Sequence, residues 1–156
     1  LDVGSGDPVV EPAESLTGPS ILAFAGIAPV MIPCYPLTQH LAEKVHAYVR
    51  PRSTGASTRV KDLVDTVLIA EQNAVDGPTL QRAIQATFEA YGADAPPVSL
   101  SQPPTTWTVT FKKLAEEVGL RNATLSAADK TARALLEPVL GGEASGVWSP
   151  VERAWR

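Results

Sequence analysis

The chain has 156 residues, of which 44% are hydrophobic, and this is enough to fill the core of one globular domain. Its formal net charge of −4 argues against a protein that coats nucleic acid electrostatically. A single cysteine, Cys34, excludes an internal disulfide framework, and no apolar run reaches the roughly 18–20 residues of a transmembrane helix. We therefore expect a soluble cytoplasmic protein with no membrane partner.

The first 36 residues contain four acids and no Lys or Arg, and they alternate apolar patches with prolines. Asp2 lies in a stretch (LDV) that is typical of a strand, where a carboxylate can face a cleft, although an Asp near a chain terminus is more often merely solvated. Residues 30–32 (VMI) predict a buried strand. Because the chain opens on a strand-like stretch without a methionine, we expect it to be the downstream portion of a longer protein.

Residues 37–70 predict two amphipathic helices that are joined by a Ser/Thr/Gly/Pro loop over residues 51–58. Apolar residues recur in both halves at the spacing of one helix face, and the first helix should end before Arg50-Pro51, because a residue that precedes proline avoids the helical region. The predicted buried stripes are Leu41, Val45 and Tyr48 in the first helix, and Val60, Leu63, Val64, Val67 and Leu68 in the second.

The same segment holds both histidines of the chain and five of its thirteen Lys and Arg residues. His40 and Lys44 are one turn apart beside the first stripe, and Lys61 and Asp65 are one turn apart beside the second. This local positive block fits either a surface that handles anions or a solvated helical hairpin. Periodicity alone favours the hairpin, with Lys61 and Asp65 as an ordinary ion pair worth about 0.2–0.5 kcal/mol.

The remainder of the chain predicts three more helices and an extended connection. One helix starts at Gly77-Pro78, a proline-rich loop or strap covers residues 93–106, and an aromatic stripe marks a helix over residues 107–118. Ser126 and Asp129 resemble a capping box that opens a last helix. We expect Trp148 and Trp155 to pack back onto the helices, and the fold class to be mainly α with a short N-terminal β part.

The residue types leave few kinds of chemistry open. The chain contains no phosphate loop, dinucleotide fingerprint, metal-binding Cys/His cluster or Ser-His-Asp order. What remains is a lysine on one helix, a carboxylate on the next and a carboxylate on an early strand. Such a set suits phosphoryl or nucleotidyl transfer, in which carboxylates hold a divalent ion and a lysine neutralises the triphosphate.

Four segments together resemble a known family. Residues 39–47 (QHLAEKVHA) and 59–65 (RVKDLVD) are similar to the third and fourth motifs of AbiEii/AbiGii-type nucleotidyltransferase toxins, which include the MenT toxins. Residues 1–7 (LDVGSGD) resemble the second motif, an acidic strand, and residues 146–150 (GVWSP) resemble the tail. The resemblance therefore spans most of the chain.

The resemblance implies the C-terminal, helical portion of an α+β nucleotidyltransferase-like protein. Residues 1–36 would be a remnant of the core strands, and residues 37–156 would form a C-terminal helical domain. Complete members transfer a nucleotide from a nucleoside triphosphate to RNA, in several cases to the acceptor end of tRNA. Such members are toxins of toxin-antitoxin systems or of systems that abort phage infection, so the resemblance implies a cognate antitoxin as a partner.

The resemblance also implies roles for individual residues. Lys44 and Asp65 would be catalytic, with Lys44 on the triphosphate. Asp2 would be a metal ligand for Mg²⁺. The implied substrate contacts are Arg59, Lys61, Asp62 and His40.

One departure from the family pattern concerns its first motif. A Gly-Ser pair with two metal-binding aspartates should precede the acidic strand, and it does not occur before Asp2. We therefore expect that this chain alone does not catalyse nucleotide transfer. The alternative is a non-catalytic helical interaction module that binds an antitoxin or the missing half.

Overall fold

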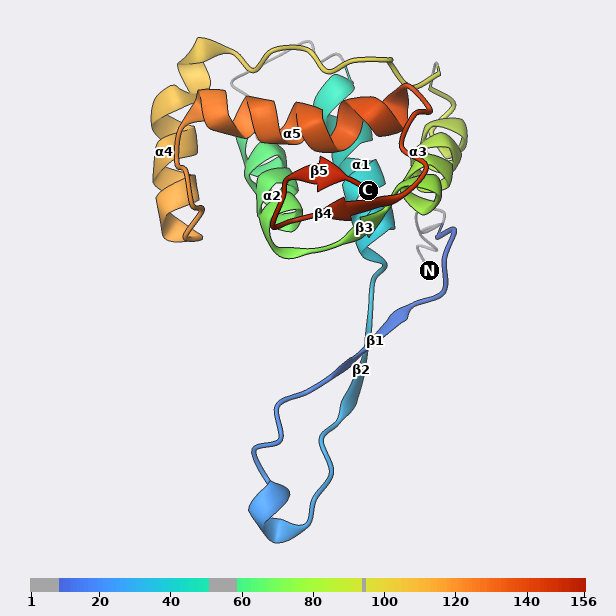
Figure 1. The fold of residues 1–156 in the computed structure, drawn as a ribbon, viewed down its shortest axis with the longest axis vertical. Coiled ribbons are helices and arrows are strands. Elements are labelled where there is room, and N and C mark those ends of the chain that lie inside the picture. Colours follow the sequence, from blue (N-terminus) through green and yellow to red (C-terminus); the bar gives the residue numbers. More distant parts are fainter. Residues whose placement is uncertain (1–8, 51–58, 94) are drawn as a thin grey trace, which may run out of the picture.

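The computed structural model describes residues 9–50, 59–93 and 95–156. These residues form a helical body from which a two-stranded arm projects, as Figure 1 shows. The fold is mainly α with a short β part, which confirms the predicted fold class.

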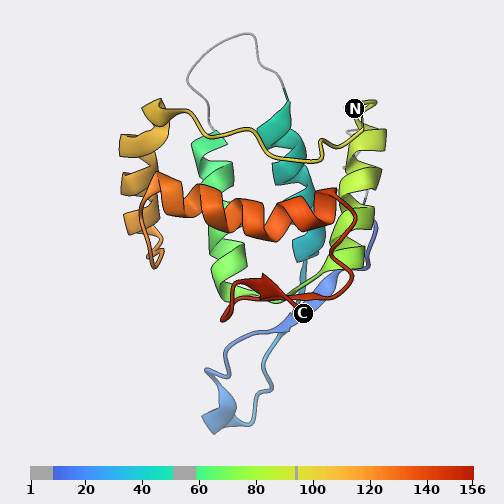
Figure 2. The ribbon, with the colours of Figure 1, turned by 45° about the horizontal axis from the view of Figure 1, so that its top comes forward.

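The helical body is built on the two helices predicted for residues 37–70. The first of them, α1, packs against both α2 and α3, while α5 crosses over α2 and ends beside α3 (Figure 2), and α4 lies beside α2. The bounds of the helices are Leu37–Val49 (α1), Arg59–Gln72 (α2), Gly77–Ala90 (α3), Thr108–Glu117 (α4) and Leu125–Leu140 (α5).

The predicted apolar stripes form one core. Leu41 on α1, Leu63 on α2 and Leu135 on α5 are at most 3% exposed, and they belong to a single cluster of buried residues. Phe111 on α4 is fully buried, so the aromatic stripe of this helix is part of the core, too. A continuous core of this kind explains why the five helices hold together as one body.

Side-chain caps begin two of these helices. Asp76 accepts a hydrogen bond from the Thr79 amide at 2.9 Å at the start of α3, and the Thr124 hydroxyl accepts one from the Ala127 amide at 3.3 Å at the start of α5. The predicted capping box of Ser126 and Asp129 is therefore wrong. The helix already begins at Leu125, so Ser126 lies inside it and Asp129 is available for another contact.

The cap of α3 gives the protein a pH-dependent contribution to stability. Hydrogen bonds from the side chain and the amide of Thr79 lower the pKa of Asp76. We expect Asp76→Ala to reduce the free energy of unfolding by about 1 kcal/mol at pH 7. Because the pKa in the folded state lies below that in the unfolded state, the contribution is complete above about pH 4 and disappears as the pH falls through the folded pKa.

Urea unfolding of the wild type and Asp76→Ala between pH 2 and pH 7 measures this contribution. The two midpoints should converge at the acidic end. Equal midpoints at pH 7 would contradict the prediction, and Asp76→Asn serves as the control because an amide oxygen also caps a helix.

A small antiparallel sheet lies at the end of the helical body from which the arm projects (Figure 2). It comprises β3 (Val75–Asp76), β4 (Val147–Ser149) and β5 (Ala154–Trp155), in that order. The Trp148 ring is fully buried and its Nε1 donates to the Ala70 carbonyl at 2.8 Å, while Trp155 donates to the Ala134 and Leu135 carbonyls. Both tryptophans thus pack onto the helices, as predicted.

The arm consists of β1 (Glu14–Thr17) and β2 (Met31–Cys34), with a single 3₁₀ turn, η1 (Ala23–Ala25), at its tip. The strands are antiparallel and pair Leu16 with Ile32. The prediction of a buried strand at residues 30–32 is wrong with respect to burial, because these three residues are 47–70% exposed. Their strand projects beyond the helices, and no described element covers it (Figure 1).

Candidate active site

Lys44, Asp62 and Asp65 form an ion-pair cluster between α1 and α2. The Lys44 Nζ lies 2.6 Å from Asp65 Oδ2 and 3.4 Å from Asp62 Oδ1. The Lys44 side chain is only 12% exposed and that of Asp65 is 42% exposed, so the cluster opens to solvent on the Asp65 side. The structure thus brings together the two residues for which the family resemblance implies a catalytic role.

The positions of the three residues along their helices explain why they meet. Lys44 precedes the buried Val45 on α1, so its aliphatic stem runs along the flank of the apolar stripe. Asp62 and Asp65 are three residues apart on α2, and residues at this spacing share one helix face. Both carboxylates therefore face the same flank of α1, where they hold the Lys44 ammonium between them.

A narrow cavity lies beneath the cluster on the side of α5. Lys44, Tyr48, Thr66 and Asp129 contribute its polar side chains, and its volume is about 10 Å³, which is room for about one water molecule. Leu100 is one of the apolar residues that line it. A nucleotide cannot enter this space as it stands, so access to Lys44 is from the exposed side of Asp65.

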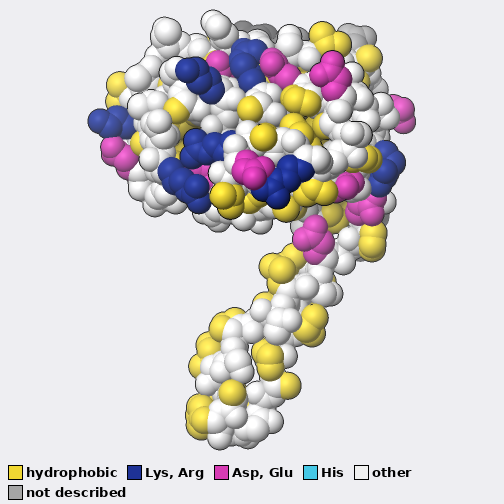
Figure 3. All heavy atoms as spheres, viewed as in Figure 1, with side chains coloured by type: hydrophobic (Ala, Val, Ile, Leu, Met, Phe, Trp, Pro, Cys, Tyr) yellow, Lys and Arg dark blue, Asp and Glu magenta, His cyan; other side chains and the backbone are white. Residues whose placement is uncertain are grey.

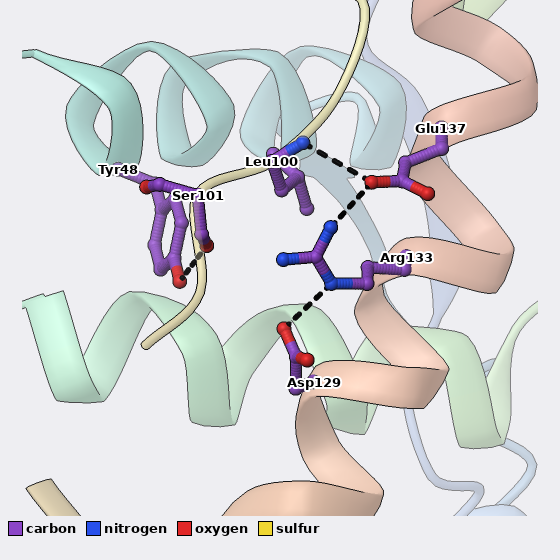
Figure 4. Close-up of polar contacts among 6 residues, drawn as sticks. All are labelled: Tyr48, Leu100, Ser101, Asp129, Arg133 and Glu137. Carbon is purple, nitrogen blue, oxygen red and sulfur yellow. Dashed lines mark hydrogen bonds and ion pairs between the residues drawn. The ribbon is translucent and has the colours of Figure 1, made fainter. Parts of the chain in front are cut away.

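Leu100 belongs to an extended strap, residues 95–104, that a network on α5 holds in place (Figure 4). The Arg133 guanidinium donates to Asp129 at 2.9 Å and to Glu137 at 2.6 Å, and Glu137 in turn accepts from the Leu100 amide at 3.2 Å. Burial alone would lower the pKa of Arg133, but the hydrogen bonds and charges of Asp129 and Glu137 raise it. The i, i+4 spacing of the three α5 residues was a visible signal of this network, but it does not indicate what they hold.

The strap is also attached to α1. The Tyr48 hydroxyl donates to the Ser101 carbonyl at 3.0 Å. Burial, and secondarily the negative charge of Asp129, raise the pKa of the Tyr48 phenol, so this group remains a neutral donor at physiological pH. The strap therefore links α1 to α5 beside the cavity that Lys44 and Leu100 line.

The other predicted site residues occupy different surroundings. Arg59 is 8% exposed and donates to the Tyr48 carbonyl at 2.6 Å, so it joins the start of α2 to the end of α1. His40 and Lys61 are exposed on α1 and α2. Asp65 receives its contact from Lys44 on the neighbouring helix, a pairing that periodicity did not predict. Asp2 lies outside the described residues.

The described residues do not fit a Mg²⁺ ion by themselves. No group of three or more His, Cys, Asp or Glu side chains in residues 9–50, 59–93 and 95–156 is placed to hold a metal. Asp62 and Asp65 both contact the Lys44 ammonium, which competes with a cation for their oxygens.

The sequence matches the model of one protein family. A sequence model described as "Nucleotidyl transferase AbiEii toxin, Type IV TA system" matches residues 1–145, which is most of the chain. The chain belongs to the AbiEii nucleotidyltransferase toxin family. No curated protein and no solved structure matches it. None of the described helices of this AbiEii-family chain is long and apolar enough to cross a membrane.

The ion pair of this AbiEii-family chain should be measurable as a coupling between two helices. In a double-mutant cycle with Lys44→Met and Asp65→Asn, we expect a coupling free energy of about 1 kcal/mol, the upper end for partly exposed pairs, because Lys44 is mostly buried. Urea unfolding of the four proteins gives this value. A matched cycle with Lys61→Met should give at most about 0.5 kcal/mol. A larger coupling for Lys61 than for Lys44 would show that Asp65 pairs within its own helix.

Proposed function

We propose that this chain supplies the helical half of a nucleotidyl-transfer site, in which Lys44 binds the triphosphate of a nucleoside triphosphate and Asp65 orients Lys44. The observation that carries the proposal is the contact of 2.6 Å between a mostly buried ammonium and a carboxylate that stays open to solvent. Family membership supports the class of reaction.

The chemistry of the lysine suits this role. An ammonium has three N–H donors, and the contacts to Asp62 and Asp65 use two of them. The third can donate to a phosphate oxygen that approaches from the open side. In nucleotidyl transfer an acceptor hydroxyl attacks the α-phosphorus, the bond to pyrophosphate breaks, and negative charge grows on the pyrophosphate. A fixed cation at that position stabilises the growing charge.

The finer assignments extend the same proposal. RNA is the acceptor, with the acceptor end of tRNA as the first candidate, and a cognate antitoxin restrains the toxin. Residues 1–36 belong with a nucleotidyltransferase core, and residues 37–156 form the helical domain. Asp2 would contribute one Mg²⁺ ligand beside the paired aspartates of the first motif, and Asp62, Arg59, Lys61 and His40 would be secondary substrate contacts.

A second candidate is a helical interaction module without a nucleotide site. The small volume of the cavity that Leu100 lines, and the contact of Arg59 with the Tyr48 carbonyl, favour it, because both resemble ordinary packing. The two candidates differ in whether Lys44 recognises a triphosphate.

Calorimetric titration of the chain with each nucleoside triphosphate, and with inorganic tripolyphosphate, tests the proposal. We expect millimolar or tighter binding that weakens at least tenfold in Lys44→Met, because the only mostly buried cation of the cluster is lost. Lys130→Met is the matched control, since Lys130 is exposed on α5. Absence of binding, or equal weakening by both substitutions, would favour the interaction module.

A further inference from the structure

Arg59 is a buried cation that joins two helices next to the ion-pair cluster. Figure 3 shows other Lys and Arg side chains on the surface of the helical body, interspersed with acids. Arg59, the first residue of α2, is by contrast only 8% exposed. Its Nη1 donates to the carbonyl of Tyr48, the last residue but one of α1, at 2.6 Å. Because the last four carbonyls of a helix have no partner within it, the Arg59 guanidinium caps the end of α1 with a positive charge.

The Arg59 contact and the ion-pair cluster are consecutive contacts between the same two helices. Lys44 and Tyr48 are four residues apart on one face of α1, and Tyr48 contacts Arg59. Lys44, one turn earlier on α1, contacts Asp62, one turn later on α2. The two helices thus run in opposite directions here. In each contact, a cation from one helix reaches an oxygen of the other.

Tyr48 is itself held in place by the rest of the fold. Its hydroxyl donates to the Ser101 carbonyl at 3.0 Å, and its ring packs edge-on against Trp107 with ring centroids 6.0 Å apart. The Trp107 side chain is buried. Arg59 therefore attaches the first turn of α2 to an immobilised residue of α1 and not to a fraying helix end.

The dimensions of a helix explain why this attachment matters for Lys44. A helix rises about 1.5 Å per residue, so a shift of α1 along α2 by two residues would move each contact by about 3 Å. A hydrogen bond of 2.6 Å does not survive such a shift. The Lys44 ammonium, on a flexible stem, can follow other oxygens, whereas a planar guanidinium binds from a fixed direction. The contact of Arg59 is therefore the one that fixes the register of the two helices.

We propose that Arg59 is a positioning residue, which holds α1 and α2 in the register that places the Lys44 ammonium between Asp62 and Asp65. This inference rests on the proposed function, in which that ammonium binds the triphosphate. Arg59 acts through the Tyr48 carbonyl, so its task does not require a contact with the substrate.

An ordinary helix cap would have a different experimental signature. It would stabilise the whole fold, as the Asp76 cap of α3 does, without changing how strongly Lys44 interacts with Asp65. A direct contact of Arg59 with the substrate would weaken ligand binding, and it too would leave the interaction of Lys44 with Asp65 unchanged. The strength of this interaction is therefore the quantity to measure.

The coupling between Lys44 and Asp65 tests the inference without any ligand. The double-mutant cycle of Lys44→Met and Asp65→Asn is repeated by urea unfolding in the Arg59→Met and the Asp76→Ala proteins. We expect the coupling to fall from about fivefold in the unfolding equilibrium constant to less than about twofold in Arg59→Met. It should remain about fivefold in Asp76→Ala, the matched control, which removes the cap of another helix.

Arg59→Lys is the conservative variant, and it also serves if Arg59→Met does not fold. It keeps a cation at this position but not the planar fork, so we expect a coupling between those of the wild type and Arg59→Met. A coupling that stays at the wild-type value in every Arg59 variant that folds would overturn the inference. So would an equal loss of coupling in Asp76→Ala, because the effect would then follow from stability alone.

Calorimetric titration with inorganic tripolyphosphate separates this inference from the proposed function. We expect binding to weaken about threefold to tenfold in Arg59→Met and to stay unchanged in Asp76→Ala. Weaker binding by Arg59→Met with an unchanged coupling would overturn the inference in favour of a direct substrate contact. Absence of binding by the wild type would count against the proposed function alone, since the coupling is measured without ligand.

Discussion

Lys44→Ala is expected to lower nucleotide transfer by about 10²–10³-fold when the chain is combined with a core that carries the first motif. This is the magnitude associated with removing one fixed group that stabilises transition-state charge. The loss should fall mainly on kcat, because Lys44 is proposed to act on charge that grows as pyrophosphate leaves. Transfer of label from nucleoside triphosphates to total tRNA provides the measurement.

Two control variants show whether the loss of nucleotide transfer is specific to Lys44. Lys130→Ala removes an exposed lysine outside the cluster and should leave transfer unchanged. Asp65→Asn keeps the shape of the Lys44 partner but removes its charge, so it should give an intermediate loss. Full activity of Lys44→Ala would refute the role of Lys44.

Trp148→Ala is expected to be the most destabilising single substitution of those considered, with a loss of about 3–5 kcal/mol in the free energy of unfolding. The ring is fully buried and packs edge-on against Trp155 with ring centroids 5.8 Å apart. Its removal leaves a cavity and deprives the Ala70 carbonyl of its donor. Since a typical domain has only 5–15 kcal/mol of stability, this change removes a large share of it.

Urea unfolding followed by circular dichroism gives the loss directly. Val147→Ala, at the adjacent and half-exposed position of β4, is the control and should cost less than about 1 kcal/mol. Trp148→Phe should fall between the two, because it keeps most of the buried ring but not the N–H donor. A loss below about 1 kcal/mol for Trp148→Ala would show that β4 does not anchor the end of α2.

The helices could be predicted from the sequence because apolar residues recur at the spacing of one helix face within each of them. The spacing of Leu41 and Val45 identifies a buried face without reference to any other part of the chain. The start of α5 was misassigned because Thr124 and Ser126 are both good caps, and the choice between them depends on where Asp129 finds its partner. That partner is Arg133, one turn further along α5, so Asp129 does not take part in a cap.

The site was less predictable than the fold. The pairing of Lys44 with Asp65 joins two helices, and neither periodicity nor local spacing determines which flank of one helix meets which flank of the next. The family resemblance singled out both residues, and the structure adds Asp62 as their common neighbour. The exposure of residues 30–32 was missed for a related reason, since apolar strand residues indicate burial but not what covers them.

The position of the strap limits the hydrogen exchange of one backbone amide, that of Leu100. The Leu100 amide donates to Glu137, and the Leu100 side chain is 7% exposed, so this amide exchanges with water only when the strap lifts. Its protection factor therefore measures the free energy of opening the space between α1 and α5. Hydrogen exchange of this one amide in deuterated buffer therefore reports how often the strap lifts from the cavity beside Lys44.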